Sequence, residues 1–217
     1  MNKHRIGTDV TVLADQTEVP GIGYLPINAF VLHADQPVVV DTGLSLPDRD
    51  FVATLSSVMD PADVRWIWLT HPDRDHTGGL YDLLDAAPQA RVITTFLSVG
   101  ILATERPLPM DRLHLVNPGQ RIDVGDRTLA AFRPPLFDNP GTTGFLDTST
   151  GYSVAAIRMA VSRSSAGDRG ARRSVAFIVD SVPVGNQVAP PRSRTCRRRG
   201  EVDGASGHHR GRWRAAG

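Results

Sequence analysis

The feature that most constrains this chain is the stretch at residues 66–80, WIWLTHPDRDHTGGL. An apolar run, typical of a buried strand, stops at Thr70 and is followed at once by two histidines and two aspartates. Two glycines come next, and a helical pattern begins near Gly78. The pattern predicts a strand that ends in a loop and continues as a helix, which is a common place for functional side chains on an α/β scaffold.

Short apolar segments with turn signals between them fill the rest of residues 1–161. Strands are predicted at four segments rich in valine and isoleucine: 9–15, 27–34, 36–43 and 64–70. Residues 48–60 show helical spacing, and 91–102 indicate a strand that turns into a helix. Residues 113–134 are typical of two or three antiparallel strands. This alternation predicts a layered α/β fold.

The four ionisable residues His71, Asp73, Asp75 and His76, which we name the 71–76 cluster, are of the types that bind zinc, iron or manganese. Crowded carboxylates repel one another, and Arg74 is the one basic residue between them. A divalent cation would relieve that repulsion directly. The alternative is a solvated polar loop whose acids cap the following helix.

Length and composition are those of one α/β domain with a tail, at 217 residues, 41% hydrophobic and 22% charged. The single cysteine, Cys196, can form neither an internal disulfide nor a CxxC pair. No apolar stretch reaches the roughly 18 residues that span a bilayer, and the first residues lack the apolar core of a secretory signal. We therefore expect a cytoplasmic protein without a membrane partner.

Charge divides the chain into two parts. Residues 1–161 carry 12 Lys and Arg against 19 Asp and Glu, a formal charge of −7, whereas residues 162–217 carry 12 Arg against 4 acids, a charge of +8. The second part is rich in Arg, Gly and Ser and contains too little apolar surface to order itself. We expect a domain at 1–161 and a disordered or aberrant tail at 162–217. No base-reading motif accompanies the arginines, so no nucleic-acid partner is expected.

Three segments together resemble the metallo-β-lactamase fold family of metal-dependent hydrolases and oxidoreductases. THPDRDHTGGL (70–80) is similar to the family signature THxHxDHxGG, and PVVVDTG (37–43) to the strand before it. NPGTTGFLDTSTG (139–151) is similar to the segment around the next metal-binding His. The resemblance implies a four-layer αβ/βα sandwich, incomplete in its C-terminal half here, with one or two Zn²⁺ or iron ions per chain.

The departures from the signature concern the first metal. Asp73 stands where the signature has its second His, as in the flavodiiron branch of the family, whose members bind two irons and reduce oxygen or nitric oxide. Asp138 falls where the third His is expected, although a slip of one residue would put Phe137 there. The resemblance thus implies a first metal held by His71, Asp73 and Asp138.

By the same resemblance, Asp75 and His76 serve a second metal, and Asp75 alternatively orients the catalytic water. Asp41 is expected to support the site by hydrogen-bonding a ligand or a loop amide. Two interpretations of the C-terminus stay open. Either it is truncated or frame-shifted, or an insertion precedes SVAFIVDS (174–181), whose Asp180 bridges the two metals. We expect structural roles for His33 and His114, a frayed terminus at His4, and no ligand role for His208 and His209.

Three functions are compatible with these residues. The first is a metal-dependent hydrolase that activates water against an ester, thioester, lactone or amide. The second is a di-iron protein that reacts with oxygen or nitric oxide, and the third is a truncated, non-catalytic remnant. The first two imply a small-molecule substrate. Neither the substrate nor the oligomeric state has a signature in the sequence.

Overall fold

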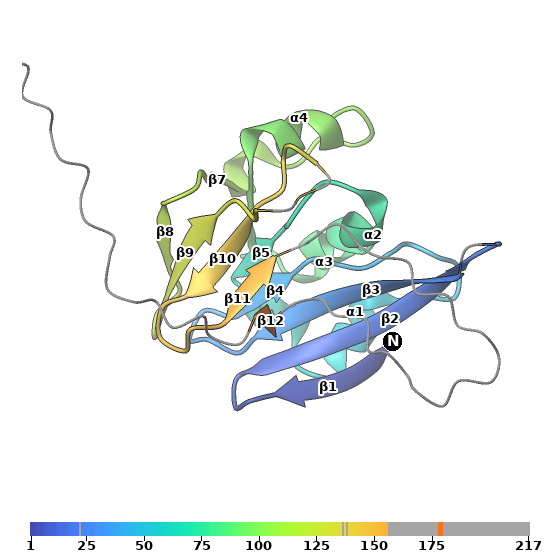
Figure 1. Cartoon of the computed structure of the whole chain (residues 1–217), viewed down its shortest axis with the longest axis horizontal. Coiled ribbons are helices and arrows are strands. Elements are labelled where there is room, and N and C mark those ends of the chain that lie inside the picture. Colours follow the sequence, from blue (N-terminus) through green and yellow to red (C-terminus); the bar gives the residue numbers. More distant parts are fainter. Residues whose placement is uncertain (22, 136, 138, 156–177, 180–217) are drawn as a thin grey trace, which may run out of the picture. The chain divides into compact units, whose positions relative to one another are not determined.

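The computed structural model describes residues 1–21, 23–135, 137, 139–155 and 178–179. All of them belong to the first of the two units into which the chain divides, Met1–Val182. This unit contains two β-sheets, and its helices gather on one face of the larger sheet (Figure 1). Among the helices described, none is long and apolar enough to cross a membrane.

The larger sheet has seven strands, which lie in space in the order of the chain. They are β1 (Asn2–Ile6), β2 (Val10–Val19), β3 (Gly23–Leu32), β4 (Val38–Val40), β5 (Trp66–Trp68), β6 (Arg91–Thr94) and β7 (Leu113–Leu115). Strands β1 to β4 pair antiparallel, and β4 to β7 pair parallel. The parallel half brings the C-terminal ends of β4, β5 and β6 to the same end of the sheet.

The smaller sheet is antiparallel throughout, in the order β12-β11-β10-β9-β8. Its strands are β8 (Arg121–Asp123), β9 (Thr128–Phe132), β10 (Gly144–Asp147), β11 (Ser153–Ala155) and β12 (Ile178–Val179). The helices are α1 (Phe51–Ser56), α2 (Arg74–Thr77), α3 (Leu80–Ala86), α4 (Phe96–Leu102), and the 3-10 turns η1 (Pro61–Asp63) and η2 (Met110–Arg112). Asp50 caps α1 and Thr95 caps α4, each by accepting a hydrogen bond from a backbone amide of the first turn.

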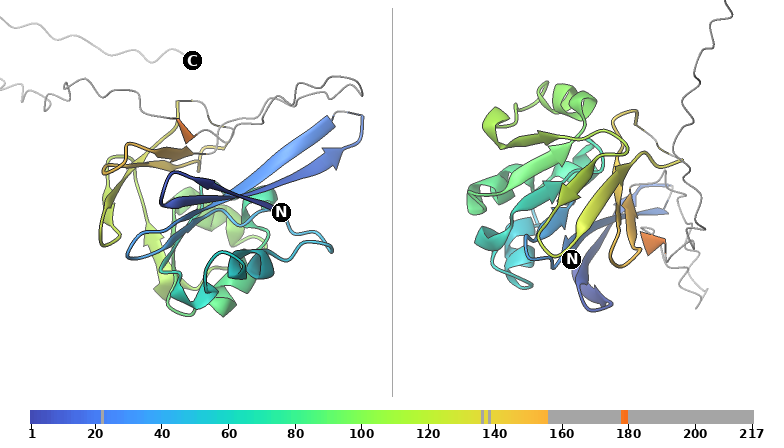
Figure 2. Two further views of the ribbon diagram at one scale, coloured as in Figure 1. Left: turned by 90° about the horizontal axis from the view of Figure 1, so that it is seen from below. Right: turned by 90° about the vertical axis from the view of Figure 1, so that its left-hand side faces the viewer.

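Alternation along the strands produces two apolar cores. In β4, Val39 belongs to the core shared with α1, α3 and α4, whereas Val38 and Val40 belong to the core between the two sheets. Trp68 of β5 and Phe145 of β10 meet in that second core, with ring centroids 4.8 Å apart. Figure 2 shows the resulting layers of helices, larger sheet and smaller sheet. The predicted α/β layering is confirmed.

One expectation was confirmed in part and another was wrong. Residues 113–134 were expected to form two or three antiparallel strands, and β8 and β9 are such a pair, but β7 pairs parallel with β6 in the larger sheet. Alternation in a short segment does not encode which strand is its partner. The expected frayed terminus is the edge strand β1, in which His4 lies opposite Val12. Residues 2–5 of that strand are exposed, so they carry no apolar signal.

Several expectations fall outside the described residues. These are the ligand assignments for Asp138 and Asp180 and the character of residues 162–177 and 180–217 of the expected tail. The boundary at residue 161 stays a prediction.

Candidate metal centre

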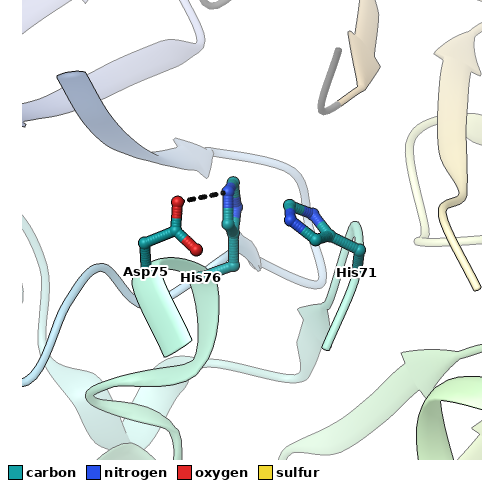
Figure 3. Close-up of side chains that lie close together, drawn as sticks. All are labelled: His71, Asp75 and His76. Atoms are coloured by element: carbon teal, nitrogen blue, oxygen red, sulfur yellow. Dashed lines mark ion pairs between the residues drawn. The ribbon is translucent and has the colours of Figure 1, made fainter. Parts of the chain in front are cut away.

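The 71–76 cluster lies at the C-terminal ends of the parallel strands. Asp41 follows β4 directly, and His71 lies in the loop after β5. Asp75 and His76 belong to α2, which begins at Arg74. In Figure 3 the rings of His71 and His76 face each other, and Asp75 lies on the far side of His76. Two neighbouring strand ends and one short helix therefore supply the side chains.

Three of the predicted ligands converge. His71, Asp75 and His76 each offer one ligand atom, and these atoms all lie within 4.8 Å of one another. The two imidazole centroids are 3.9 Å apart, and Nε2 of His76 lies 3.4 Å from Oδ2 of Asp75. His71 is 2% exposed, whereas the side chains of Asp75 and His76 are partly open to solvent. Imidazole and carboxylate donors within this span suit a divalent cation.

Asp73, the fourth residue of the cluster, lies beside His71 at the N-cap position of α2. Its side chain makes no capping hydrogen bond, so the capping explanation of this acid-rich loop does not account for it. Its Oδ2 lies 3.6 Å from Nε2 of His71, and its Oδ1 accepts a 3.4 Å hydrogen bond from Asn139. The side chain is 49% exposed, which leaves it free to turn toward an ion.

Asp41 has a backbone conformation that is uncommon outside glycine. Among the described residues it is the one non-glycine residue with a positive φ, at 56°. Its buried Oδ1 accepts a 2.8 Å hydrogen bond from the Thr70 amide. Its Oδ2 lies 2.6 Å from the Thr70 hydroxyl and 2.7 Å from Nδ1 of His76. These contacts, to a loop amide and to a candidate ligand, agree with the supporting role expected for Asp41.

Thr70 is a site residue that the sequence analysis did not select. Its hydroxyl lies 3.3 Å from Nδ1 of His71 and 3.4 Å from Nδ1 of His76, in addition to its contact with Asp41. The residue is 1% exposed. The signal available in the sequence was its position, at the end of a buried apolar run and directly before His71.

Two glycines bring the start of α3 against the end of β4. The Gly78 amide donates to the Gly43 carbonyl at 2.7 Å, and the Gly79 amide donates to the Thr42 carbonyl at 3.1 Å. A Cβ on Gly78 would lie 2.1 Å from the backbone nitrogen of Ser45. Only glycine fits such an approach, so this pair holds together the two loops that carry the site.

The carboxylates around His76 favour a positive charge at the centre of the cluster. Burial alone would lower the pKa of His76, but Asp41 and Asp75 outweigh it and raise this pKa to about 10. Burial would raise the pKa of Asp75, yet the hydrogen bond and charge of His76, with the charge of His71, lower it. The protonated imidazole of His76 thus offsets the neighbouring carboxylates, and a bound metal ion would supply that positive charge in its place.

The other histidines make different contacts. Nε2 of His33 lies 2.9 Å from the hydroxyl of Thr11, and His114 packs edge-on against Trp66. Burial, with a nearby arginine in each case, lowers the pKa of both imidazoles. His208 and His209, like Asp138 and Asp180, lie outside the described residues.

The family model described as the metallo-beta-lactamase superfamily matches residues 22–143. An anaerobic nitric oxide reductase flavorubredoxin from Salmonella typhi is 27% identical over 99 residues, which are 46% of this chain and 21% of that protein. A type A flavoprotein fprA from Rhodobacter capsulatus is 33% identical over 118 residues, 53% of this chain and 27% of that protein. The matches therefore span about a quarter of the length of these relatives.

Solved structures show the same fold. A rubredoxin oxygen:oxidoreductase from Desulfovibrio gigas has a TM-score of 0.63 at 15% identity, covering 71% of this chain and 40% of that one. A flavodiiron protein from Giardia intestinalis has a TM-score of 0.62 at 14% identity, with the same coverage. The predicted αβ/βα sandwich is confirmed by this likeness and by the family model.

Proposed function

Because the chain belongs to the metallo-beta-lactamase superfamily, we propose that its 71–76 cluster binds iron and that the protein reacts with dioxygen or nitric oxide. The relatives named nitric oxide reductase flavorubredoxin and type A flavoprotein favour this oxidoreductase function over hydrolysis. Dioxygen or nitric oxide would then be the small-molecule substrate.

Asp73 is the main reason for proposing iron rather than zinc. It replaces an imidazole of the signature with a carboxylate, and its Oδ2 lies beside Nε2 of His71 without serving as a helix cap. Oxygen donors suit harder cations, whereas imidazole suits borderline ions such as zinc. The donor set of this chain therefore favours iron more than the ordinary signature does.

Each residue of the cluster has a proposed role. His71 and Asp73 would hold a first ion, together with Asp138, and Asp75 and His76 would hold a second, with Asp180 between the two. The chemistry that iron supplies when bound is electron transfer to dioxygen or nitric oxide. Asp75, kept ionised by His76, is available as a metal ligand or as the group that orients a water.

Hydrolysis is the second candidate, and the position of Asp75 is the observation behind it, because its carboxylate lies 3.4 Å from Nε2 of His76 and is partly open to solvent. An ionised carboxylate there can orient a metal-activated water toward an ester, thioester, lactone or amide. Zinc would be the ion in that case, because zinc lowers the pKa of a bound water to about 7.

The test compares two metal loadings of one purified protein. The chain is loaded anaerobically with Fe²⁺ or with Zn²⁺, and consumption of dioxygen and of nitric oxide is followed after chemical reduction. A panel of esters, thioesters and lactones is offered to the same samples. We expect gas consumption from the iron-loaded sample alone and little hydrolysis from either.

The His71→Ala variant is the control for iron bound elsewhere, since it should lose both the metal and the gas consumption. Substantial hydrolysis by the zinc-loaded protein, with no gas consumption by the iron-loaded one, would replace the proposed function with the second candidate. Failure of the unaltered chain to bind either metal would favour the remnant.

A further inference from the structure

We infer that Thr70 and Asp41 act as a pair of positioning residues that hold both cluster histidines with Nε2 available to the metal. One buried carboxylate orients His76 directly, and it orients His71 through the Thr70 hydroxyl. The inference rests on the proposed metal centre and adds a residue, Thr70, that does not itself bind the ion.

Proton counting at the Thr70 hydroxyl fixes the tautomer of His71. The hydroxyl has one proton, and its contact of 2.6 Å with Oδ2 of Asp41 is its shortest. A carboxylate accepts hydrogen bonds, so the proton of the hydroxyl goes to Asp41. The contact of 3.3 Å with Nδ1 of His71 is then a hydrogen bond only if His71 donates. Nδ1 of His71 therefore carries the proton, and Nε2 presents its lone pair.

His76 is held at both its side chain and its backbone. Its Nδ1 donates to Oδ2 of Asp41 at 2.7 Å. Its carbonyl accepts from the amide of Thr42 at 2.7 Å and from the hydroxyl of the same residue at 3.1 Å. These contacts leave Nε2 directed at Asp75, 3.4 Å from Oδ2.

The two histidines thus share one arrangement. Each presents Nδ1 to the buried pair Asp41 and Thr70, and each presents Nε2 to an aspartate of the 71–76 cluster. Asp41 reaches this position through its left-handed backbone conformation, which is unfavourable for a non-glycine residue. Such a conformation at a buried carboxylate supports a positioning role.

Substitution of Thr70 tests the inference with two matched variants and one control. Thr70→Val keeps the shape and removes the hydroxyl, whereas Thr70→Ser keeps the hydroxyl. Thr94→Val is the control, because Thr94 is fully buried at the end of the neighbouring strand β6 and its hydroxyl has no partner among the described residues. Zn²⁺ affinity is measured by competition with a chelator, and long-range ¹H–¹⁵N NMR of the metal-free protein reports the tautomer of His71.

We expect Thr70→Val to weaken Zn²⁺ binding by about 10- to 100-fold, the usual effect of removing an outer partner of a metal-binding histidine. His71 in this variant should become a mixture of tautomers. Thr70→Ser should keep both the Zn²⁺ affinity and the single tautomer of His71. Thr94→Val should match the unaltered protein in both. The restoration by serine separates positioning from packing, because serine lacks the methyl group of threonine.

Two results would overturn the inference. One is an Nε2–H tautomer of His71 in the unaltered, metal-free protein, which requires no variant to fold. The other is weakened binding in Thr70→Ser equal to that in Thr70→Val, which would assign the role to the methyl group. If the protein binds zinc as expected but iron-loaded samples consume neither gas, the proposed function fails while the positioning role stands.

Discussion

Asp73 is the residue whose chemistry distinguishes this chain from the common signature. We predict that Asp73→His raises the ratio of bound zinc to bound iron by about tenfold, a change that needs only about 1.4 kcal/mol of differential affinity. An added imidazole favours the borderline ion, and the lost carboxylate disfavours the harder one. Elemental analysis of protein purified from medium that contains both metals measures the ratio.

Asp63→His is the control for this substitution, because Asp63 is exposed in η1 and belongs to no cluster of metal-binding groups among the described residues. It should leave the ratio unchanged. If the unaltered protein takes zinc alone and Asp73→His changes nothing, Asp73 is not a metal ligand.

His71 and His114 make a second matched pair. We predict that His71→Ala removes most of the bound metal, since His71 is buried beside Asp75 and His76. His114→Ala should keep the metal, because His114 packs against Trp66 and lies outside the cluster. Metal content per chain is measured for both, and equal content in His71→Ala and the unaltered protein would refute the assignment.

The half-buried imidazole of His33 predicts a dependence of stability on pH. Partial burial, reinforced by the charge of Arg5 and partly offset by Asp9, holds the folded pKa of His33 below the ordinary histidine value of 6.5. The unfolded chain therefore binds the proton more readily, and the contribution of His33 is fully favourable above pH 6.5 and is lost as the pH falls through the folded pKa.

NMR titration of the His33 ring should give a pKa below 6.5, and His33→Gln should lose less unfolding free energy between pH 7.5 and 5.5 than the unaltered protein. A measured pKa above 6.5 would contradict the burial argument.

Among the elements, the close approach of α3 to β4 depends on Gly78. We predict that Gly78→Ala destabilises the protein by about 1–3 kcal/mol or more, the usual cost of overpacking, because its Cβ would meet backbone atoms of Leu44 and Ser45 that cannot rotate away. Chemical denaturation measures the change.

Gly100→Ala is the matched control in a helix. A Cβ at Gly100 meets nothing within 4 Å, and the residue lies exposed in α4. Alanine there should stabilise the protein by roughly 0.5–1 kcal/mol through its better helix propensity. Equal changes in the free energy of unfolding for the two substitutions would show that the close approach of residues 44–45 to Gly78 does not exclude a Cβ there.

Element types could be predicted where local pattern decides them. The apolar run before His71 forms β5, and the spacing around Phe51 and Leu55 forms α1. The partner of β7 could not be predicted, because pairing is decided by packing between segments distant in the chain. The role of Thr70 could not be predicted for the same reason, because it depends on the left-handed conformation of Asp41, a residue 29 positions away.

At the scale of the whole unit, one largely buried arginine connects the two sheets. Arg127 lies between β8 and β9 of the smaller sheet, and its side chain is 10% exposed. It forms ion pairs with Asp9, which precedes β2 of the larger sheet, and with Asp147 at the end of β10, at 3.2 Å for the latter. Asp126, its neighbour in the chain, completes the group at 2.6 Å.

We predict that Arg127→Met lowers the free energy of unfolding by about 3–5 kcal/mol, because it leaves Asp147, at 1% exposure, as a buried carboxylate without its cation. Methionine keeps most of the apolar stem, so the loss reports the charge rather than the packing. Arg121→Met, at an exposed position of β8, should change this free energy by less than about 0.5 kcal/mol. Urea unfolding followed by tryptophan fluorescence is a suitable measurement, because Trp68 lies in the core between the sheets. A loss below about 1 kcal/mol for Arg127→Met would mean that this core alone joins the two sheets, with the ion pairs adding little.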